Sequence, residues 1–485
     1  MNAIMVNDND RSTVTGSSPR GVRAALLAVS LALSTLTVAA AEQKDAALPG
    51  WLTQPMSLGE AIRTALAQNG DILKSQHDLE AAHGVAIQTR AILLPKLRGA
   101  SDYQHTEAVE KDPGSSSQSF RPPKDQWSGS VRLVQSLYEG GRMVSAFRSA
   151  RLVQEQAYQE YQTIIANTLL ATRTAYYDVL LAEQEIIVRD AAVKLLAQEL
   201  ENTKRRFEAG AVPRFDVLRG EVAVANARPK LIRARNAWRT AKTKLASGLG
   251  YNIPASVRED LPLNLTTKLD PEPYDIALPL ALAQAKERRS ELGALRTEVD
   301  LQRERVVAAQ SGYKPSLGVF ASYGGHNTQF REEFYRDVAG PTAGVELRWD
   351  IFDGLATQGK VVEARARQSR SSVSLDDMTR RVEQEVRTAY SSFIEAREVL
   401  ESQKKVAEQA EEAIRLAASR YDAGSSTQLD VLNAQTSLTE ARTTQIEAAR
   451  DYLVARARLE RAMGLDVVQE QTSAPTRIEI WKPNP

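Results

Sequence analysis

Two aspartates recur in the same short context, and their type and spacing could do chemistry. Asp216 begins the run Asp-Val-Leu, Asp430 begins an identical run 214 positions later, and each lies six residues after a glycine, Gly210 or Gly424. Carboxylates gathered at the mouth of a pore would draw cations and repel anions over about one Debye length, roughly 8 Å at physiological salt. The alternative is that each aspartate only caps or begins a helix.

No other set of side chains has the spacing of a catalytic or metal centre. Among the 4 His of the chain, His77 and His83 lie six positions apart, on different faces of a helix, so surface histidines are favoured over a metal site. The absence of Cys excludes a disulfide framework, a thiolate metal site, a Cys nucleophile and lipidation on Cys. The Gly-Gly pairs at 140 and 324 precede no Lys-Ser/Thr of a phosphate loop. We expect neither an enzyme nor a cofactor.

Charge and composition narrow the class of protein further. Lys+Arg at 62 and Asp+Glu at 61 nearly cancel, and no basic stripe with interleaved aromatic residues appears, so a nucleic acid is excluded as a partner. A chain of 485 residues could hold two or three ordinary domains, yet it contains only 19 Pro and 26 Gly. Long uninterrupted elements are therefore predicted.

The N-terminal segment has the pattern of an export signal. Arg20 and Arg23 precede an apolar run over 24–38, which ends in three alanines at 39–41. We predict a signal peptide over 1–41, cleaved after Ala41. The alternative, an N-terminal membrane anchor, is disfavoured because the run is shorter than the roughly 20 residues of a spanning helix. No later run approaches that length, which leaves closed strands as the way for this chain to cross a bilayer.

The sequence repeats once. Residues 95–97 (Pro-Lys-Leu) recur as 315–317 (Pro-Ser-Leu), and 206–210 (Arg-Phe-Glu-Ala-Gly) recur as 420–424 (Arg-Tyr-Asp-Ala-Gly), in collinear order. The offset is 220 before the polar connection 107–126 and 214 after it, so that connection carries the length difference and has the composition of an exposed loop. The predicted divisions are an N-terminal segment 42–56, a first repeat 57–265, a linker 266–274, a second repeat 275–465 and a C-terminal tail 466–485.

Each repeat contains two segments that alternate with period 2. The predicted strands are about 97–106 and 127–138 in the first repeat, and about 316–325 and 342–352 in the second. One face of these strands is apolar and the other is polar or charged, which is typical of a barrel wall with lipid outside and water inside. A half-buried strand in a soluble sheet is the alternative. The predicted lipid-facing residues are Trp127, Val131, Leu133, Val345, Leu347 and Trp349.

The remaining segments have a helical period. Val386, Phe393 and Leu400 fall seven residues apart, and Ala389 and Ala396 occupy the positions three further on. This pattern predicts a coiled-coil seam with small residues that permit close helix approach. The predicted long helices are about 142–209, 213–248, 355–423 and 427–463.

Four strands cannot close a membrane barrel, for which about eight is the lower limit. Open sheet edges are not tolerated in lipid, so an oligomer is expected. Three chains would supply twelve strands and twelve helix positions.

At this level of detail the chain resembles the TolC family of outer-membrane efflux proteins. The resemblance rests on the duplicated order of elements, the turns 138–142 and 352–354 that open long helices, and the tips 207–210 and 421–424. It implies a mainly α fold with a membrane β-barrel portion: a trimeric 12-stranded barrel continued by a 12-helix tunnel. A homotrimer would form a passive exit duct across the lipid of a Gram-negative outer membrane, with a long periplasmic extension. A secreted or periplasmic coiled-coil scaffold is the alternative.

The same resemblance implies partners and site residues. A periplasmic membrane-fusion adaptor, serving an inner-membrane pump of RND, ABC or MFS type, would dock at the tips; a plain turn is the alternative there. This sequence departs from the family pattern at Ser426, where a basic residue can stand, and at Asn433, where a second acidic residue can stand. The implied entrance constriction is Asp216, Tyr421, Asp430 and Asn433, and the implied docking tips are Gly210, Ala211, Val212, Gly424, Ser425 and Ser426.

Overall fold

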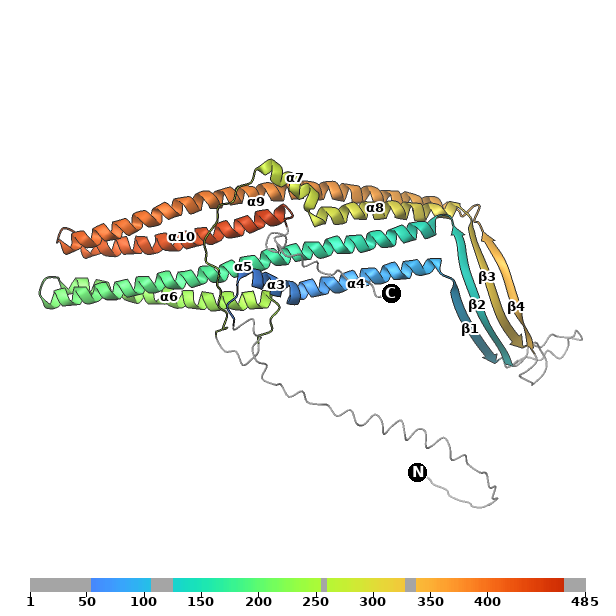
Figure 1. The fold of residues 1–485 in the computed structure, drawn as a ribbon, viewed down its shortest axis with the longest axis horizontal. Coiled ribbons are helices and arrows are strands. Elements are labelled where there is room, and N and C mark those ends of the chain that lie inside the picture. Colours follow the sequence, from blue (N-terminus) through green and yellow to red (C-terminus); the bar gives the residue numbers. More distant parts are fainter. Residues whose placement is uncertain (1–53, 106–124, 254–259, 328–336, 466–485) are drawn as a thin grey trace, which may run out of the picture. The chain divides into compact units, whose positions relative to one another are not determined.

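The structure is a computed structural model that describes residues 54–105, 125–253, 260–327 and 337–465 (Figure 1). The predicted signal peptide 1–41 and tail 466–485 lie outside the described residues, as does most of the connection 107–126. The helices are α3 (Leu58–Gln68), α4 (Gly70–Arg90), α5 (Arg142–Glu208), α6 (Arg214–Gly248), α7 (Leu278–Arg288), α8 (Ser290–Gln310), α9 (Ala356–Asp422) and α10 (Gln428–Ala462). The strands are β1 (Lys96–His105), β2 (Asp125–Glu139), β3 (Ser316–Asn327) and β4 (Asp337–Arg348), and short 3-10 turns precede β1 and β3.

The element order confirms the internal duplication. Two shorter helices, two strands, a long helix and a returning helix follow one another as α3 to α6 and again as α7 to α10. The long helices α5 and α9 both have 67 residues, and the returning helices α6 and α10 both have 35 residues. At about 1.5 Å per residue, each long helix extends about 100 Å.

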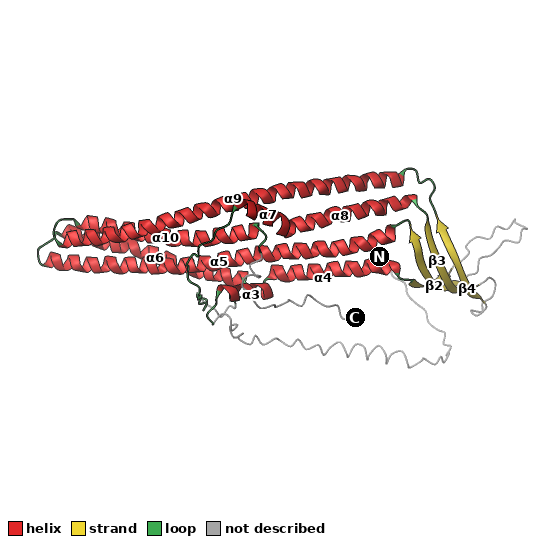
Figure 2. Cartoon of the chain, turned by 45° about the horizontal axis from the view of Figure 1, so that its top comes forward, coloured by secondary structure: helices red, strands yellow, loops and turns green. Residues whose placement is uncertain are grey.

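The helices form a layer with four positions across (Figures 1 and 2). The long helices α5 and α9 each occupy one position along their whole length. In a third position α6 ends where α4 begins, and the Asn69 side-chain amide donates to the Gly248 carbonyl at 2.8 Å. In the fourth, α10 ends where α8 begins, and Arg289 donates to the Ala462 carbonyl at 3.3 Å. Two shorter helices stacked end to end therefore match the length of one long helix.

The predicted seam on α9 is buried. Val386, Phe393, Leu400 and Ala407 repeat every seven residues and are all at most 5% exposed. Phe393 packs against Tyr452 of α10 with ring centroids 5.4 Å apart, so the seam joins the two helices of the second hairpin. No helix in the described part of the chain is both long and apolar enough to cross a membrane.

The four strands form one antiparallel sheet in the order β1-β2-β3-β4. The start and end of β4 differ from the prediction. The strand begins earlier, at Asp337, and runs through Pro341. Pro341 lacks an N–H but is tolerated here because β4 is an edge strand, and one side of an edge strand needs no donor. The strand ends at Arg348 because its partner β3 begins at Ser316, directly opposite. Trp349, predicted within the strand, lies just beyond it and donates its indole N–H to the Tyr313 carbonyl at 3.3 Å.

The segment between α6 and α7 is fixed against both hairpins. The Tyr176 hydroxyl of α5 donates to the Thr267 hydroxyl at 2.9 Å, and the buried Lys242 of α6 donates to the Leu261 carbonyl at 2.7 Å. Further along, the Tyr452 hydroxyl of α10 donates to the Glu272 carbonyl at 2.9 Å. This segment therefore links the first hairpin to the second near the middle of the helical layer.

Candidate functional site

The two hairpin tips turn in the same way. After α5, Gly210 adopts a φ of 72°, its N–H donates to the Phe207 carbonyl at 2.9 Å, and the Ala211 N–H donates to the Arg206 carbonyl at 2.8 Å. This pair of bonds is the Schellman motif, which satisfies carbonyls that a helix end leaves unpaired and needs a left-handed residue such as Gly. The second tip repeats it with Gly424 at a φ of 72° and bonds from Gly424 to Tyr421 and from Ser425 to Arg420.

The second tip starts its returning helix with a capping box. Thr427 is the N-cap of α10, and Asp430 is the third residue of that helix. One carboxylate oxygen of Asp430 accepts from the Thr427 N–H at 2.9 Å, the Thr427 hydroxyl at 2.8 Å and the Ser426 hydroxyl at 2.8 Å. These bonds, that from the Thr427 N–H foremost, favour the ionised form and hold the pKa of Asp430 below its usual value.

The first tip lacks this box. Its N-cap is Pro213, which has no N–H and no side-chain oxygen, and the structure shows no side-chain cap there. Asp216 occupies the position equivalent to Asp430, and its nearest ionic partner is Arg219 at 3.9 Å on the same helix. The two aspartates are thus at equivalent positions, but of the two carboxylates it is that of Asp430 that accepts hydrogen bonds from the residues of its turn.

A contact between the tips was not predicted from the sequence. The Arg206 guanidinium at the end of α5 lies 2.7 Å from the Asp422 carboxylate at the end of α9 and 4.6 Å from the centre of the Tyr421 ring. Burial raises the pKa of the nearby Glu199 carboxyl, and the negative charge of Asp422 raises it further, although Arg206 acts in the opposite direction. We call Arg206, Tyr421 and Asp422 the tip clasp.

The other predicted tip residues lie at the surface. Ala211, Gly424 and Ser425 are exposed, and Val212 and Ser426 are half-buried, all within the two turns. Asn433, the remaining residue of the predicted constriction, is exposed one helical turn after Asp430.

The sheet has one apolar and one polar face. Leu133 pairs with Leu97 and Ala321 across β1, β2 and β3, and Leu347 pairs with Leu317, so these side chains share a face. The predicted apolar residues Val131, Leu133, Val345 and Leu347 are 41% to 68% exposed, and Trp127 is half-buried. On the other face Arg132 lies over the Phe320 ring at 4.5 Å, and Arg348 pairs with Glu346 at 2.7 Å.

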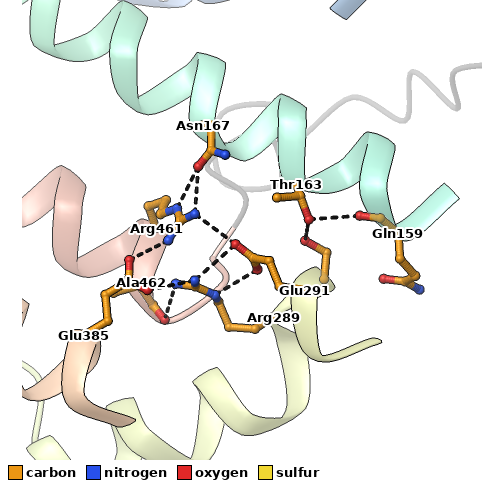
Figure 3. A network of polar contacts seen from close by, with 9 residues as sticks. Gln159, Thr163, Asn167, Arg289, Glu291, Glu385, Arg461 and Ala462 are labelled. Atoms are coloured by element: carbon orange, nitrogen blue, oxygen red, sulfur yellow. Dashed lines mark hydrogen bonds and ion pairs between the residues drawn. The ribbon is translucent and has the colours of Figure 1, made fainter. Parts of the chain in front are cut away.

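A charged network surrounds the junction of α10 with α8 (Figure 3). Arg289 and Arg461 both contact both carboxylates, Glu291 and Glu385; Arg289 lies 2.9 Å from Glu291 and 2.8 Å from Glu385. Arg461 also donates to the Asn167 side chain of α5 at 2.7 Å. The network therefore ties together α5, α8, α9 and α10.

The two histidines considered as metal ligands have other neighbours. His77 lies 3.4 Å from Glu80, and the ring of His83 lies 3.3 Å from the Gln154 amide. Among the described residues, no three His, Asp or Glu side chains are grouped so that they could hold a metal ion.

The family of outer membrane efflux proteins matches this chain over residues 61–251 and 281–465, one match for each repeat. The chain belongs to this family. It is similar to the outer membrane protein TolC of Escherichia coli, with 26% identity over 85% of this chain and 83% of that protein. It is also similar to the alkaline protease secretion protein AprF of Pseudomonas aeruginosa, with 25% identity over 83% of each chain.

Solved structures share the fold. The outer-membrane channel OprN superposes with a TM-score of 0.71 at 18% identity, over 84% of this chain and 90% of that one. The CmeC outer membrane channel of Campylobacter jejuni superposes with a TM-score of 0.72 at 15% identity, over 85% and 88%. The family match confirms the predicted class, a TolC-like outer-membrane efflux protein, and the solved structures confirm its mainly helical fold with strands.

Proposed function

We propose that this chain is one subunit of a homotrimeric outer-membrane exit duct, through which substrates pass passively from the periplasm to the exterior of a Gram-negative cell. The observation that carries the proposal is the sheet. Its apolar side chains are exposed, and within the described chain β1 and β4 each pair along one edge only. Both features are costly in a monomer and are satisfied if three copies close twelve strands into a barrel in lipid.

The helical layer supports the same assembly. Its four positions lie beside one another and continue from the sheet (Figure 2). Three copies would place twelve helical positions around a tunnel in line with the barrel. The tunnel itself would carry out no reaction and hold no cofactor.

The tips are the proposed periplasmic end of the duct. We assign docking of a periplasmic adaptor, which serves an inner-membrane pump, to the two turns at 210–212 and 424–426. The family name points to efflux, and the name of the relative AprF points to protease secretion, so an RND, ABC or MFS pump fits the proposal. Asp216, Tyr421, Asp430 and Asn433 would line the constriction at this entrance.

Planar-bilayer conductance with two matched variants tests the duct. Val345 lies on the apolar face, and Thr342 lies three residues away in the same strand on the other face, paired with Ser322. An arginine on the lipid face costs about 2–4 kcal/mol at the bilayer midplane. We expect Val345→Arg to lower the yield of conducting channels much more than Thr342→Arg. A coiled-coil scaffold would give no conductance and would tolerate both substitutions equally, and that result would refute the proposal.

A further inference from the structure

The internal duplication relates the pairing of strands in one repeat to the pairing in the other. The sequence offset is 220 residues from β1 to β3 and 214 residues from β2 to β4. In the first repeat, Leu97 of β1 lies opposite Leu133 of β2. The two offsets convert this pair to Leu317 opposite Leu347, which is the pair observed between β3 and β4. The offsets therefore carry the register of one strand pair to its counterpart.

The pairing of β2 with β3, in the centre of the sheet, maps onto the two edges of the sheet. In this pairing Ser136 lies opposite Gly318. The same offsets convert the pair to Asp350, just after β4, and Arg98 of β1. Because β1 and β4 are the opposite edges of one sheet (Figure 1), these two residues can meet where β4 of one copy lies beside β1 of the next.

The segment that follows β4 has the position of a strand but lacks a partner. In the first repeat, β2 continues to Glu139 because it pairs with β3 on its second side. The equivalent segment 349–353 lies beyond the end of β4 at Arg348 and pairs with no strand in the described part of the chain. Within it, Phe352 is 80% exposed, and Leu97, which the mapping places opposite Phe352, is 70% exposed. A strand added along this edge would pair the segment and bring the two apolar side chains together.

The mapped pairs have a charge complementarity that the observed pairs lack. Within the strand pairs that the structure describes, no Asp or Glu lies directly opposite a Lys or Arg. The mapping puts Asp350 opposite Arg98. It also puts Asp353 opposite Lys96, and all four side chains are exposed. Arg98 lies opposite Arg132 within its own sheet, and like charges in that arrangement are destabilising. A carboxylate on the other side of Arg98 would offset this repulsion.

The mapping also opposes two carboxylates, Glu346 and Asp102. Each of them already has a partner within the chain. Arg348 lies 2.7 Å from Glu346, and the Ser128 hydroxyl donates to Asp102 at 2.8 Å. Their repulsion is therefore reduced and does not argue against the mapped register.

We propose that β4 of one copy pairs with β1 of the next in this register, and that residues 349–353 continue β4 as the copies assemble. The proposal rests on the ring-shaped trimer of the proposed function and specifies how its copies are aligned. A slip of one residue would turn every side chain to the opposite face, and the ion pairs Asp350–Arg98 and Asp353–Lys96 favour this alignment over larger slips. Each exposed ion pair is weak by itself, but a trimer contains each of them three times.

Disulfide cross-linking tests the register, because the natural chain has no Cys. In the full-length protein, Asp350→Cys with Arg98→Cys should join chains into covalent dimers and trimers under mild oxidation, seen on a non-reducing denaturing gel. Ser136→Cys with Gly318→Cys is the matched control, since this observed pair should lose its free thiols and keep the mass of one subunit. A Cβ at Gly318 would meet no atom closer than 3.6 Å, so a cysteine fits there.

Asp350→Cys with Ala100→Cys tests the alignment more finely. In the proposed register these positions are diagonal neighbours roughly 7 Å apart, whereas a disulfide needs about 4 Å between Cβ atoms. Joining of chains through Ala100 instead of Arg98 would overturn the register. Chains that stay separate with both pairs, in protein that light scattering shows to be trimeric, would also overturn it and leave the duct intact. Monomers by light scattering would refute both.

Charge exchange tests whether the ion pairs hold the copies together. Asp350→Arg would place a cation beside Arg98 and Arg132, and it should lower the temperature at which the trimer dissociates, most strongly at low salt. Arg98→Asp alone should lower that temperature as well, because two carboxylates then face each other. The double variant restores opposite charges between copies and should recover most of the loss. A double variant that dissociates as readily as Asp350→Arg would contradict the pairing.

Discussion

The two hairpins have helices of equal length but different ends. At the second tip, Thr427 and Asp430 form a capping box, to which Ser426 adds a further hydrogen bond. At the first tip Pro213 offers no donor, and Asp216 lies 3.9 Å from Arg219. The same residue type at equivalent positions therefore has two roles. Asp430 stabilises the start of a helix, whereas Asp216 has no part in a capping box.

The C-terminal ends of the returning helices α6 and α10 also differ, because the contacts of α6 there are neutral and those of α10 are charged. Where α6 meets α4, the neutral Asn69 caps α4, accepting from the Asp71 N–H at 2.9 Å, and donates to Gly248. Where α10 meets α8, the equivalent residue is Arg289, within the four-charge network of Figure 3. The second hairpin is thus attached by charged contacts at both ends, which predicts that it resists local opening more than the first.

The largest difference is expected at these junctions. Arg289→Ala removes a cation that is 5% exposed and leaves two carboxylates to Arg461 alone, at a cost of about 3 kcal/mol. Asn69→Ala removes a helix cap and should cost about 1 kcal/mol. We expect the thermal unfolding midpoint of the detergent-solubilised protein, followed by circular dichroism, to be lower for Arg289→Ala than for Asn69→Ala. Equal midpoints would mean that the charged network adds nothing to the attachment.

The next largest effect on stability is expected at the capping box of α10. Thr427→Ala removes the N-cap hydroxyl and should destabilise the start of α10 by about 1 kcal/mol. Pro213→Thr is the reciprocal change, since it gives Asp216 the hydroxyl and N–H that Asp430 has, and it should slow amide hydrogen exchange at the start of α6. Exchange that is unaffected in both variants would remove the distinction between the tips.

Acid should weaken the second tip. A carboxyl whose pKa is lower in the folded than in the unfolded state stabilises the fold fully above its unfolded pKa, about 3.9 for Asp. Because the pKa of Asp430 is lowered, that contribution is lost as the pH falls below about 3.9 through the folded value. Hydrogen exchange in the first turn of α10 should accelerate there, relative to Asp430→Asn at the same pH. Parallel behaviour of the two proteins would argue against an ionised capping box.

The smallest effect concerns ion selectivity. Asp216→Asn changes charge without breaking a capping bond, so it should lower cation preference in planar bilayers and leave thermal stability nearly unchanged. Asp430→Asn should also lower cation preference, but with weaker attachment of the tip, because its carboxylate accepts three bonds. If Asp216→Asn leaves the reversal potential in a salt gradient unchanged, Asp216 does not contribute to an acidic entrance.

Periodic features of the fold were predictable from the sequence. The seven-residue spacing of Val386, Phe393 and Leu400 predicted the buried seam, and the period-2 segments predicted the strands. The end of β4 was harder to predict from the sequence, because it depends on where the partner strand β3 begins rather than on Trp349 itself. The tip clasp could not be read locally, since Arg206 and Asp422 lie 216 residues apart.

The capping box was different, because Thr427 and Asp430 are three residues apart and their spacing is a known helix-start signal. What the sequence left open was whether Asp430 caps the helix or lines the pore. The hydrogen bonds show that it helps to start α10, and its position at the mouth stays a prediction.

The central claim is that one chain is a third of a duct, and the mass of the assembled particle tests it most directly. Full-length protein extracted from outer membranes in mild detergent is measured by light scattering coupled to size exclusion, with the detergent contribution subtracted. The account predicts a protein mass of three subunits, because the sheet of the described chain has two edges without a partner strand. A stable, well-behaved particle with the mass of one subunit would contradict it.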